Sequence, residues 1–345
     1  MNLYPFAGAD ECLALAGHRV SVPAIAFSPD GSRLVSVAKD QTVALWDSAS
    51  GQRNWEGDRL LPSPGQAVAF CPEGKLVATG DWDTHLIQLW DAASGRQLLQ
   101  LTDAPWPQTW TLQFVPDSES GLRLVRGSDG VATWQIGSAR EVLDHGIEAV
   151  RFVGSRWLDM RTGVVTAPDG KRVAFISGGT TIVQDLLAEQ PSLTLAPNTS
   201  AGSVQPVAFS PDGGTLAVLL SENRVAVFDA TTGELRRSFA VTGPNPDGRQ
   251  LVLSHTGHWL AVTSGSMRGV EIHDFATGEL RYTLPDRVGT VYWLAWHPKE
   301  PRLAIARDNG DIAIWDLAKI DRQLADLGLG FAPDPSEVPP TKDNR

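Results

Sequence analysis

The sequence predicts an all-β protein, a seven-bladed β-propeller built of four-stranded antiparallel blades. Two signals recur along its 345 residues: a turn of the type Ser-Pro-Asp-Gly and a strand end of the type Leu-Trp-Asp. Counting degenerate forms, each signal occurs seven times, and 17 to 19 residues always separate a turn from the strand end that follows it. Such regular repeats are typical of radial folds, in which each blade buries its faces against its neighbours.

Each repeat contains the signals of four strands, named a to d. An apolar run (strand a) leads into the turn, and a second (strand b) follows it. Strand c ends at the Trp-Asp signal, and a Gly turn such as Gly51 leads into strand d. The a–b turns lie at Pro29, Pro72, Pro116, Pro168, Pro211, His255 and Pro298. The strand c ends lie at Asp47, Asp91, Gln135, Asp185, Asp229, Asp274 and Asp316.

The strand c ends carry a family resemblance. Leu45-Trp46-Asp47, Leu89-Trp90-Asp91 and Ile314-Trp315-Asp316 resemble the signature of WD40 repeats, and the resemblance covers roughly residues 11–316. It implies a propeller that acts as an interaction platform. It also implies a buried hydrogen-bonded network of His18, Ser36, Asp40 and Trp46. The other blades lack this histidine, and we expect packing alone to hold them.

The segments outside the regular repeat have separate roles. Residues 1–10 are a tail, and the strand at 11–16 fits the strand d that the last blade lacks, which would close the ring. An irregular insertion is expected at about 145–162, as an enlarged loop or an added strand between blades 3 and 4. Residues 317–330 predict an amphipathic helix and 331–345 a disordered Pro-rich tail. This ending resembles those of bacterial WD-repeat regions, a loose link to signalling.

Composition argues against several classes of function. The chain has 29 Lys and Arg against 40 Asp and Glu, a net charge of −11, which disfavours binding to nucleic acid or to a membrane surface. Two cysteines do not make a disulfide framework. No secretory signal or transmembrane segment is evident, so a cytoplasmic monomer is expected.

Catalytic chemistry has little support in the sequence. His255 and His258 form an H-x-x-H, but they lie in an a–b turn with no third ligand nearby, so no metal site or cofactor is expected. No nucleophile elbow or phosphate-binding loop is present. We therefore predict a non-catalytic protein-interaction scaffold. A propeller enzyme or a small-ligand sensor with its site in the central channel remains the alternative.

The connections between strands indicate where a partner would bind. In an up-and-down sheet the d–a and b–c connections share one end, and here these vary most in length and chemistry. Aromatic and arginine side chains, which are enriched at binding hot spots, gather there. The predicted protein-binding residues are Trp82, Trp106, Trp110, Arg249, Tyr292 and Arg307. Their basic character favours an acidic or phosphorylated partner; the alternative is that they only pack the loops.

Overall fold

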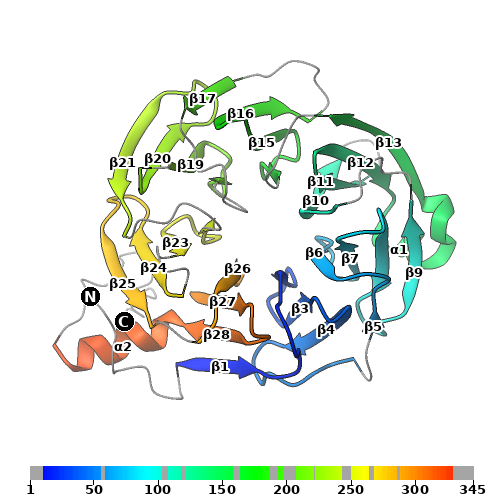
Figure 1. The fold of residues 1–345 in the computed structure, drawn as a ribbon, viewed down its shortest axis with the longest axis horizontal. Coiled ribbons are helices and arrows are strands. Elements are labelled where there is room, and N and C mark those ends of the chain that lie inside the picture. Colours follow the sequence, from blue (N-terminus) through cyan, green and yellow to red (C-terminus); the bar gives the residue numbers. More distant parts are fainter. Residues whose placement is uncertain are drawn as a thin grey trace, which may run out of the picture.

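The strands form a closed ring of seven sheets. The computed structural model describes residues 11–55, 59–102, 108–117, 121–157, 164–186, 193–197, 207–220, 222–242, 250–263, 268–285 and 288–328. Within these ranges it contains seven four-stranded antiparallel sheets. Figure 1 shows them arranged radially, with strand a of each blade nearest the centre and strand d at the rim. The predicted seven-bladed propeller is therefore confirmed.

The first three blades follow the chain in order. Blade 1 contains β2 (Ala24–Phe27), β3 (Arg33–Val37), β4 (Thr42–Asp47) and the short β5 (Arg59–Leu60). Blade 2 contains β6 (Gly65–Phe70), β7 (Leu76–Asp81), β8 (Ile87–Asp91) and β9 (Gln97–Leu101). Blade 3 contains β10 (Thr111–Asp117), β11 (Gly121–Gly127), β12 (Gly130–Ile136) and β13 (Val150–Trp157).

Blades 4 to 6 repeat this order. Blade 4 contains β14 (Val165–Thr166), β15 (Arg172–Ser177), β16 (Thr180–Asp185) and β17 (Leu193–Pro197). Blade 5 contains β18 (Val207–Phe209), β19 (Thr215–Leu220), β20 (Arg224–Asp229) and β21 (Leu235–Ala240). Blade 6 contains β22 (Leu251–Leu253), β23 (Trp259–Thr263), β24 (Val270–Asp274) and β25 (Leu280–Leu284).

Blade 7 joins the two ends of the propeller. It contains β26 (Val291–Trp296), β27 (Arg302–Arg307) and β28 (Ile312–Asp316), and its fourth strand is β1 (Cys12–Leu15). β1 pairs antiparallel with β28, so that Cys12 lies opposite Trp315 and Leu15 opposite Ile312. The N-terminal strand therefore closes the ring as predicted, and β28 has no open edge.

The hydrophobic core is divided among the seams between blades. The buried apolar residues of the described chain form seven clusters, each shared mainly by two neighbouring blades. The motif tryptophans lie in these seams: Trp46, Trp90, Trp134 and Trp315 are each at most 2% exposed. Each packs toward the preceding blade, Trp46 toward blade 7 and Trp90 toward blade 1. The ring thus depends on every seam, because no blade covers its own faces.

The extra length near residue 145 is helical. α1 (Ala139–His145) and the 3₁₀ turn η1 (Gly146–Ala149) lie between β12 and β13, so they belong to the c–d connection of blade 3. Ser138 caps α1 in a capping box with Glu141. β13 is the regular outer strand of blade 3, and residues 158–163 lie outside the described residues. In the described residues, the segment from 145 to 157 therefore lies within blade 3, as an enlarged c–d connection and its outer strand.

A second helix follows blade 7 directly. α2 (Leu317–Asp326) lies within the range 317–330 predicted to be helical, and Asp316, the last residue of β28, is its N-cap. Its apolar side chains Leu317, Ile320 and Leu324 are buried in the seam of blades 6 and 7. The predicted tails at 1–10 and 331–345 lie outside the described residues.

Blade 1 contains the hydrogen-bonded network that the resemblance implies, with one more member. Trp46 Nε1 donates to Ser36 Oγ at 2.8 Å, and Ser36 Oγ lies 2.7 Å from His18 Nε2. His18 Nδ1 lies 2.9 Å from Thr42 Oγ1, which donates to Asp40 at 2.5 Å. Thr42 therefore relays the contact between the histidine and the aspartate.

Packing alone does not hold the d–a connections of the other blades, contrary to expectation. In blade 3, Arg126 takes the strand position of Ser36 and donates to Thr109 Oγ1 at 2.9 Å and to the Gln108 carbonyl at 2.7 Å. Before blade 6, Glu271 accepts from the backbone N–H of Thr242 at 3.1 Å. Each side chain ties the end of a blade to the connection that enters it, as His18 does in blade 1.

Candidate protein-interaction face

The connections gather into two faces of the ring. The loop face is defined as the end that carries the d–a and b–c connections, and the turn face as the end that carries the a–b and c–d connections. Of the six predicted binding residues, Trp82, Trp110, Tyr292 and Arg307 are described and belong to the loop-face ends of their blades. Trp106 and Arg249 lie outside the described residues.

Trp82 and Trp110 form an aromatic pair across the seam of blades 2 and 3. Their rings meet edge to face, with centroids 5.0 Å apart and planes at 79°. Trp82 follows β7 and its N–H donates to the Pro64 carbonyl at 3.0 Å, while the Trp110 N–H donates to the Gly127 carbonyl at 2.9 Å. These backbone bonds fix both residues, and both side chains remain partly exposed.

Trp110 also carries an unused hydrogen-bond donor. Its indole Nε1 is buried and has no hydrogen-bond partner among the described residues. A buried donor without an acceptor is costly, about 1 to 3 kcal/mol, so it is uncommon in a folded protein. The tryptophan pair, defined as Trp82 and Trp110, thus combines apolar ring surface with an unsatisfied donor beside it.

Arg307 supports the loop face from below and is not part of its surface. It is 1% exposed, and its Nη1 donates to the carbonyls of Arg268 at 2.8 Å and Gly289 at 3.1 Å. Arg126 is likewise fully buried, and burial lowers its pKa to about 10. Both guanidinium groups hold loops in place. The prediction that Arg307 itself contacts a partner conflicts with this burial.

Tyr292, which is partly exposed, lies in a second group of side chains at the seam of blades 7 and 1. Lys39 Nζ lies 5.4 Å from the centre of the Tyr292 ring, a cation–π geometry. Val288 and Val20, which are 83% and 40% exposed, flank the turn between β27 and β28. Asn309 in that turn donates to the Val288 carbonyl at 3.1 Å. We call Val20, Lys39, Val288 and Tyr292 the valine patch.

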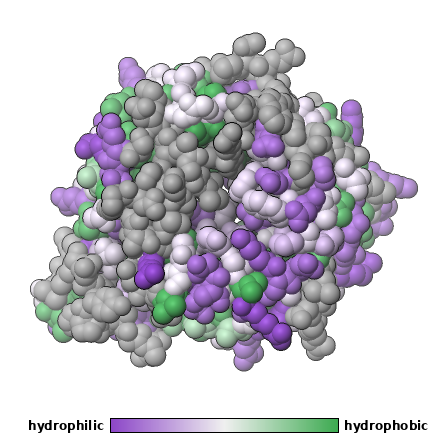
Figure 2. Space-filling view, in the orientation of Figure 1, coloured by the Kyte–Doolittle hydropathy of each residue, from purple (hydrophilic) through white to green (hydrophobic). Residues whose placement is uncertain are grey.

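The valine patch was only partly predictable from the sequence. Tyr292 and Lys39 carry the aromatic and basic character expected of the loop face, but Val20 and Val288 are ordinary residues of d–a connections. Their exposure is the signal that distinguishes them, because large exposed aliphatic side chains are few in the described residues. Figure 2 shows one face of the ring as mainly hydrophilic, with isolated hydrophobic spots.

The central channel offers little for catalysis. The cavity there, of about 370 Å³, is bounded by the a strands and is lined mainly by apolar side chains, with no carboxylate or histidine among them. Its polar members Gln113 and Thr166 bond to each other, Thr166 Oγ1 donating to Gln113 Oε1 at 2.5 Å. Elsewhere in the described ranges, no three His, Cys, Asp or Glu side chains gather closely enough to hold a metal ion.

Comparison with known families identifies the repeat at the closing seam. Residues 10–47 and 278–316 match the model of the WD domain, G-beta repeat. These two segments are WD40 repeats. They cover β1 to β4 and β25 to β28, so they meet across the seam between blades 7 and 1. The network of His18, Ser36 and Trp46 lies within the first of these WD40 repeats.

Three curated proteins are similar to this chain over longer segments. Rat telomerase protein component 1 is 27% identical over 63% of this chain and 8% of its own length. Mouse pre-mRNA-processing factor 17 is 25% identical over 87% of this chain and 51% of its own length. The tobacco guanine nucleotide-binding protein subunit beta is 22% identical over 64% and 60%. The chain spans less than two thirds of each, and the bacterial resemblance of its ending stays a prediction.

No helix in the described part of this chain is both long enough and apolar enough to cross a membrane.

Proposed function

We propose that this protein is a non-catalytic interaction scaffold that binds a protein or peptide on its loop face, with the tryptophan pair at the centre of the contact. The observation that carries the proposal is the edge-to-face pair of two partly exposed tryptophan rings, which backbone hydrogen bonds fix on the loop face. Apolar side chains of a partner would cover the exposed parts of these rings.

The relatives support an interaction role. Their names call one a component and another a subunit, the description expected of proteins that work within assemblies. The valine patch supplies a second contact area on the same face, with Lys39 as its exposed cation. Two aspartates lie beside this patch, and both already accept hydrogen bonds. Asp40 accepts from the Thr42 N–H, and Asp308 accepts from the Thr290 N–H at 2.8 Å. A partner segment with acidic or phosphorylated side chains would fit this arrangement.

The alternative, an enzyme or small-ligand sensor in the channel, has less support. Its site would need titratable or strongly polar groups from several blades. The channel lining instead presents apolar side chains and a glutamine and a threonine that bond to each other. Trp106 and Arg249 stay predicted members of the loop-face contact, and a role in bacterial signalling stays a hypothesis from the C-terminal resemblance.

Affinity capture from an extract of the native cell tests the proposal. The tagged wild type is compared with Trp82→Ala/Trp110→Ala, and with Arg96→Ala/Lys171→Ala as a control on exposed turn-face positions. Circular dichroism and thermal melting first establish that all three are folded. We expect a partner that the wild type and the turn-face control retain and the tryptophan variant loses. Equal capture by all three forms, or no captured partner, would contradict the proposal.

A further inference from the structure

A cavity of about 390 Å³ opens on the turn face between blades 6 and 7. Its walls include His255 and His258 from the a–b turn of blade 6, and Lys299 and Glu300 from that of blade 7. Trp259 of β23 and Ala318 of α2 also line the cavity. The cavity faces away from the loop face, so nothing in the proposed interaction role accounts for it.

Blades 1, 4 and 7 each have an arginine that crosses to the next blade on the turn face, and blade 6 has none at that position. In blade 1, Arg33 reaches blade 2 and donates to the carbonyls of Gly74 at 2.7 Å and Ala92 at 3.1 Å. Arg172 of blade 4 makes the equivalent bonds to Gly213 and Ala230. In blade 6 the position of Arg33 is taken by Trp259. The N–H of Ser254 donates to the Trp259 carbonyl, as the N–H of Ser28 donates to the Arg33 carbonyl.

The tryptophan packs within the seam. It is 7% exposed and belongs to the apolar cluster that blades 6 and 7 share, and the guanidinium carbon of Arg281 lies 4.5 Å from its ring centre. Arg281 in turn pairs with Asp321 of α2 at 3.3 Å. Trp259 therefore forms one wall of the cavity and supplies no guanidinium group to cross to blade 7.

The two a–b turns around this cavity lack the aspartate that other blades have there. The a–b turns of blades 1, 4 and 5 carry Asp30, Asp169 and Asp212, whose carboxylates accept backbone hydrogen bonds within the turn. At the same position blade 6 has Thr256, whose Oγ1 lies 3.1 Å from Ser254 Oγ, and blade 7 has Lys299. In a chain of net charge −11, two adjacent turns have thus lost their aspartates.

The lining supplies donors for an anion. His255 stands where blade 1 has Pro29, and His258 stands where it has Ser32, so two imidazoles and one ammonium group border the cavity. The one carboxylate of the lining, Glu300, is engaged by the Nε of Arg302 at 2.6 Å. Imidazole and ammonium groups are common partners of phosphate oxygens, and a phosphate accepts hydrogen bonds from several sides at once.

We propose that this cavity binds a phosphate monoester, with Lys299 and His255 as its principal partners and Trp259 beside the group that carries the phosphate. A phosphorylated side chain of another protein and a free phosphorylated small molecule share this chemistry. The site is independent of the loop-face contact, so either proposal can fail without the other.

Calorimetric titration in a phosphate-free buffer tests the site directly. The probes are phenyl phosphate, benzoate, phenol and a short phosphoserine peptide, each added to the full chain. The variants are Lys299→Gln, which removes an exposed positive charge, and His255→Gln/His258→Gln, which removes two exposed imidazole groups. Arg96→Gln is the matched control, because it removes one exposed positive charge elsewhere on the turn face. Thermal melting verifies that each variant is folded.

We expect one phenyl phosphate per chain, unchanged binding by Arg96→Gln, and binding at least ten-fold weaker in the other two variants. Tighter binding of the phosphoserine peptide would assign the ligand to a protein, and tighter binding of phenyl phosphate to a small molecule. The proposal is overturned if the wild type binds no phosphate probe, or if the cavity variants bind as the wild type does. Equal binding of phenol or benzoate would also overturn it, since the site would then not select phosphate.

Discussion

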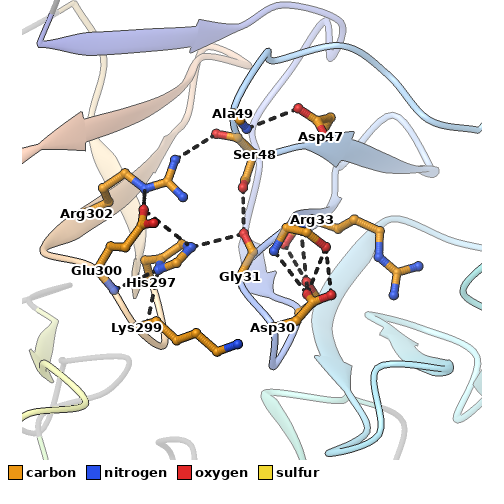
Figure 3. A network of polar contacts seen from close by, with 12 residues as sticks. Asp30, Gly31, Arg33, Asp47, Ser48, Ala49, His297, Lys299, Glu300 and Arg302 are labelled. Carbon is orange, nitrogen blue, oxygen red and sulfur yellow. Dashed lines mark hydrogen bonds and ion pairs between the residues drawn. The ribbon is translucent and has the colours of Figure 1, made fainter.

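The Nε2 of His297 lies 3.1 Å from the carbonyl oxygen of Gly31 and joins blade 7 to blade 1 on the turn face (Figure 3). The other ring nitrogen, Nδ1, accepts the backbone N–H groups of Lys299 at 3.2 Å and Glu300 at 3.0 Å. Nδ1 must be unprotonated to accept these bonds, so Nε2 carries the proton and donates it to Gly31. In the same seam Arg302 donates to the Ser48 carbonyl at 3.2 Å. The closure therefore depends on polar contacts in addition to β1.

Substitution of Gly31 by alanine should weaken this seam. Gly31 has a φ of +81°, and a Cβ there would lie 2.1 Å from His297 Nε2, so the imidazole would have to move. Gly178 also has a positive φ, of +56°, but a Cβ there would meet nothing within 4 Å. Both substitutions strain the backbone by about 1 to 2 kcal/mol. We expect Gly31→Ala to lower the free energy of unfolding by about 2 kcal/mol more than Gly178→Ala, measured by urea denaturation. Equal losses would show that the seam tolerates displacement of His297.

The stability of the ring should fall at mildly acidic pH because of His297. Burial lowers the pKa of His297 below its ordinary value, the positive charge of Arg302 adds to the lowering, and the neighbouring Glu300 opposes it. The unfolded chain takes up this proton as pH falls through about 6.5, whereas the folded chain does so only at lower pH. In that window the unfolded state binds more protons, so the free energy of unfolding falls by up to about 1.4 kcal/mol per pH unit.

The pH effect can be separated from other titrating groups with His297→Asn. This variant cannot take up the proton, so its free energy of unfolding should decline less steeply than that of the wild type between pH 7.5 and pH 5. Urea denaturation at several pH values measures both slopes. Parallel curves would rule out His297 as the source of the acid sensitivity.

The closing strand offers a matched pair of substitutions. Leu15 is 2% exposed and packs in the seam of blades 7 and 1, while Ala14, its neighbour on β1, is exposed. Leu15→Asp buries a charge in an apolar cluster and should cost about 3 kcal/mol or more. Ala14→Asp should cost less than about 0.5 kcal/mol. A small effect of both in thermal or urea denaturation would mean that β1 contributes little to the closed ring.

The arginine that crosses the seam of blades 4 and 5 should also be measurable. Arg172 donates to the Ala230 carbonyl at 3.1 Å and the Gly213 carbonyl at 2.9 Å, whereas Lys171 beside it is exposed. Loss of hydrogen bonds to a charged donor costs about 1.5 to 3 kcal/mol. We expect Arg172→Met to lower the free energy of unfolding by this amount, and Lys171→Met to leave it within about 0.5 kcal/mol. Similar values for the two variants would argue that the crossing bonds are replaced by water.

The sequence was sufficient for the ring but only partly for its interaction face. The spacing from Pro29 to Asp47 recurs, within one residue, in all seven repeats, and each occurrence predicts one four-stranded blade. This prediction does not depend on what a blade binds. The helix α1 also has a local sequence signal, the capping box of Ser138 and Glu141.

The sequence does not predict which side chains of different blades contact each other. Arg307 stands at the end of strand b beside a variable turn, and nothing in the spacing tells whether its guanidinium points outward or under the loops. Trp82 and Trp110 belong to different repeats, and only the ring brings their side chains together. The exposure of Val20 and Val288 likewise depends on how neighbouring connections pack, which no single repeat encodes.

The central claim, that a protein partner sits over the tryptophan pair, is tested most directly by site-specific photo-crosslinking. The photoreactive residue p-benzoylphenylalanine replaces exposed Asp83, next to Trp82 on the loop face, or exposed Arg96 on the turn face. Both proteins are irradiated in an extract of the native cell. We predict a covalent adduct with one partner from position 83 and none with that partner from position 96. Adducts with the same partner from position 96 alone, or from neither position, would contradict binding at the tryptophan pair.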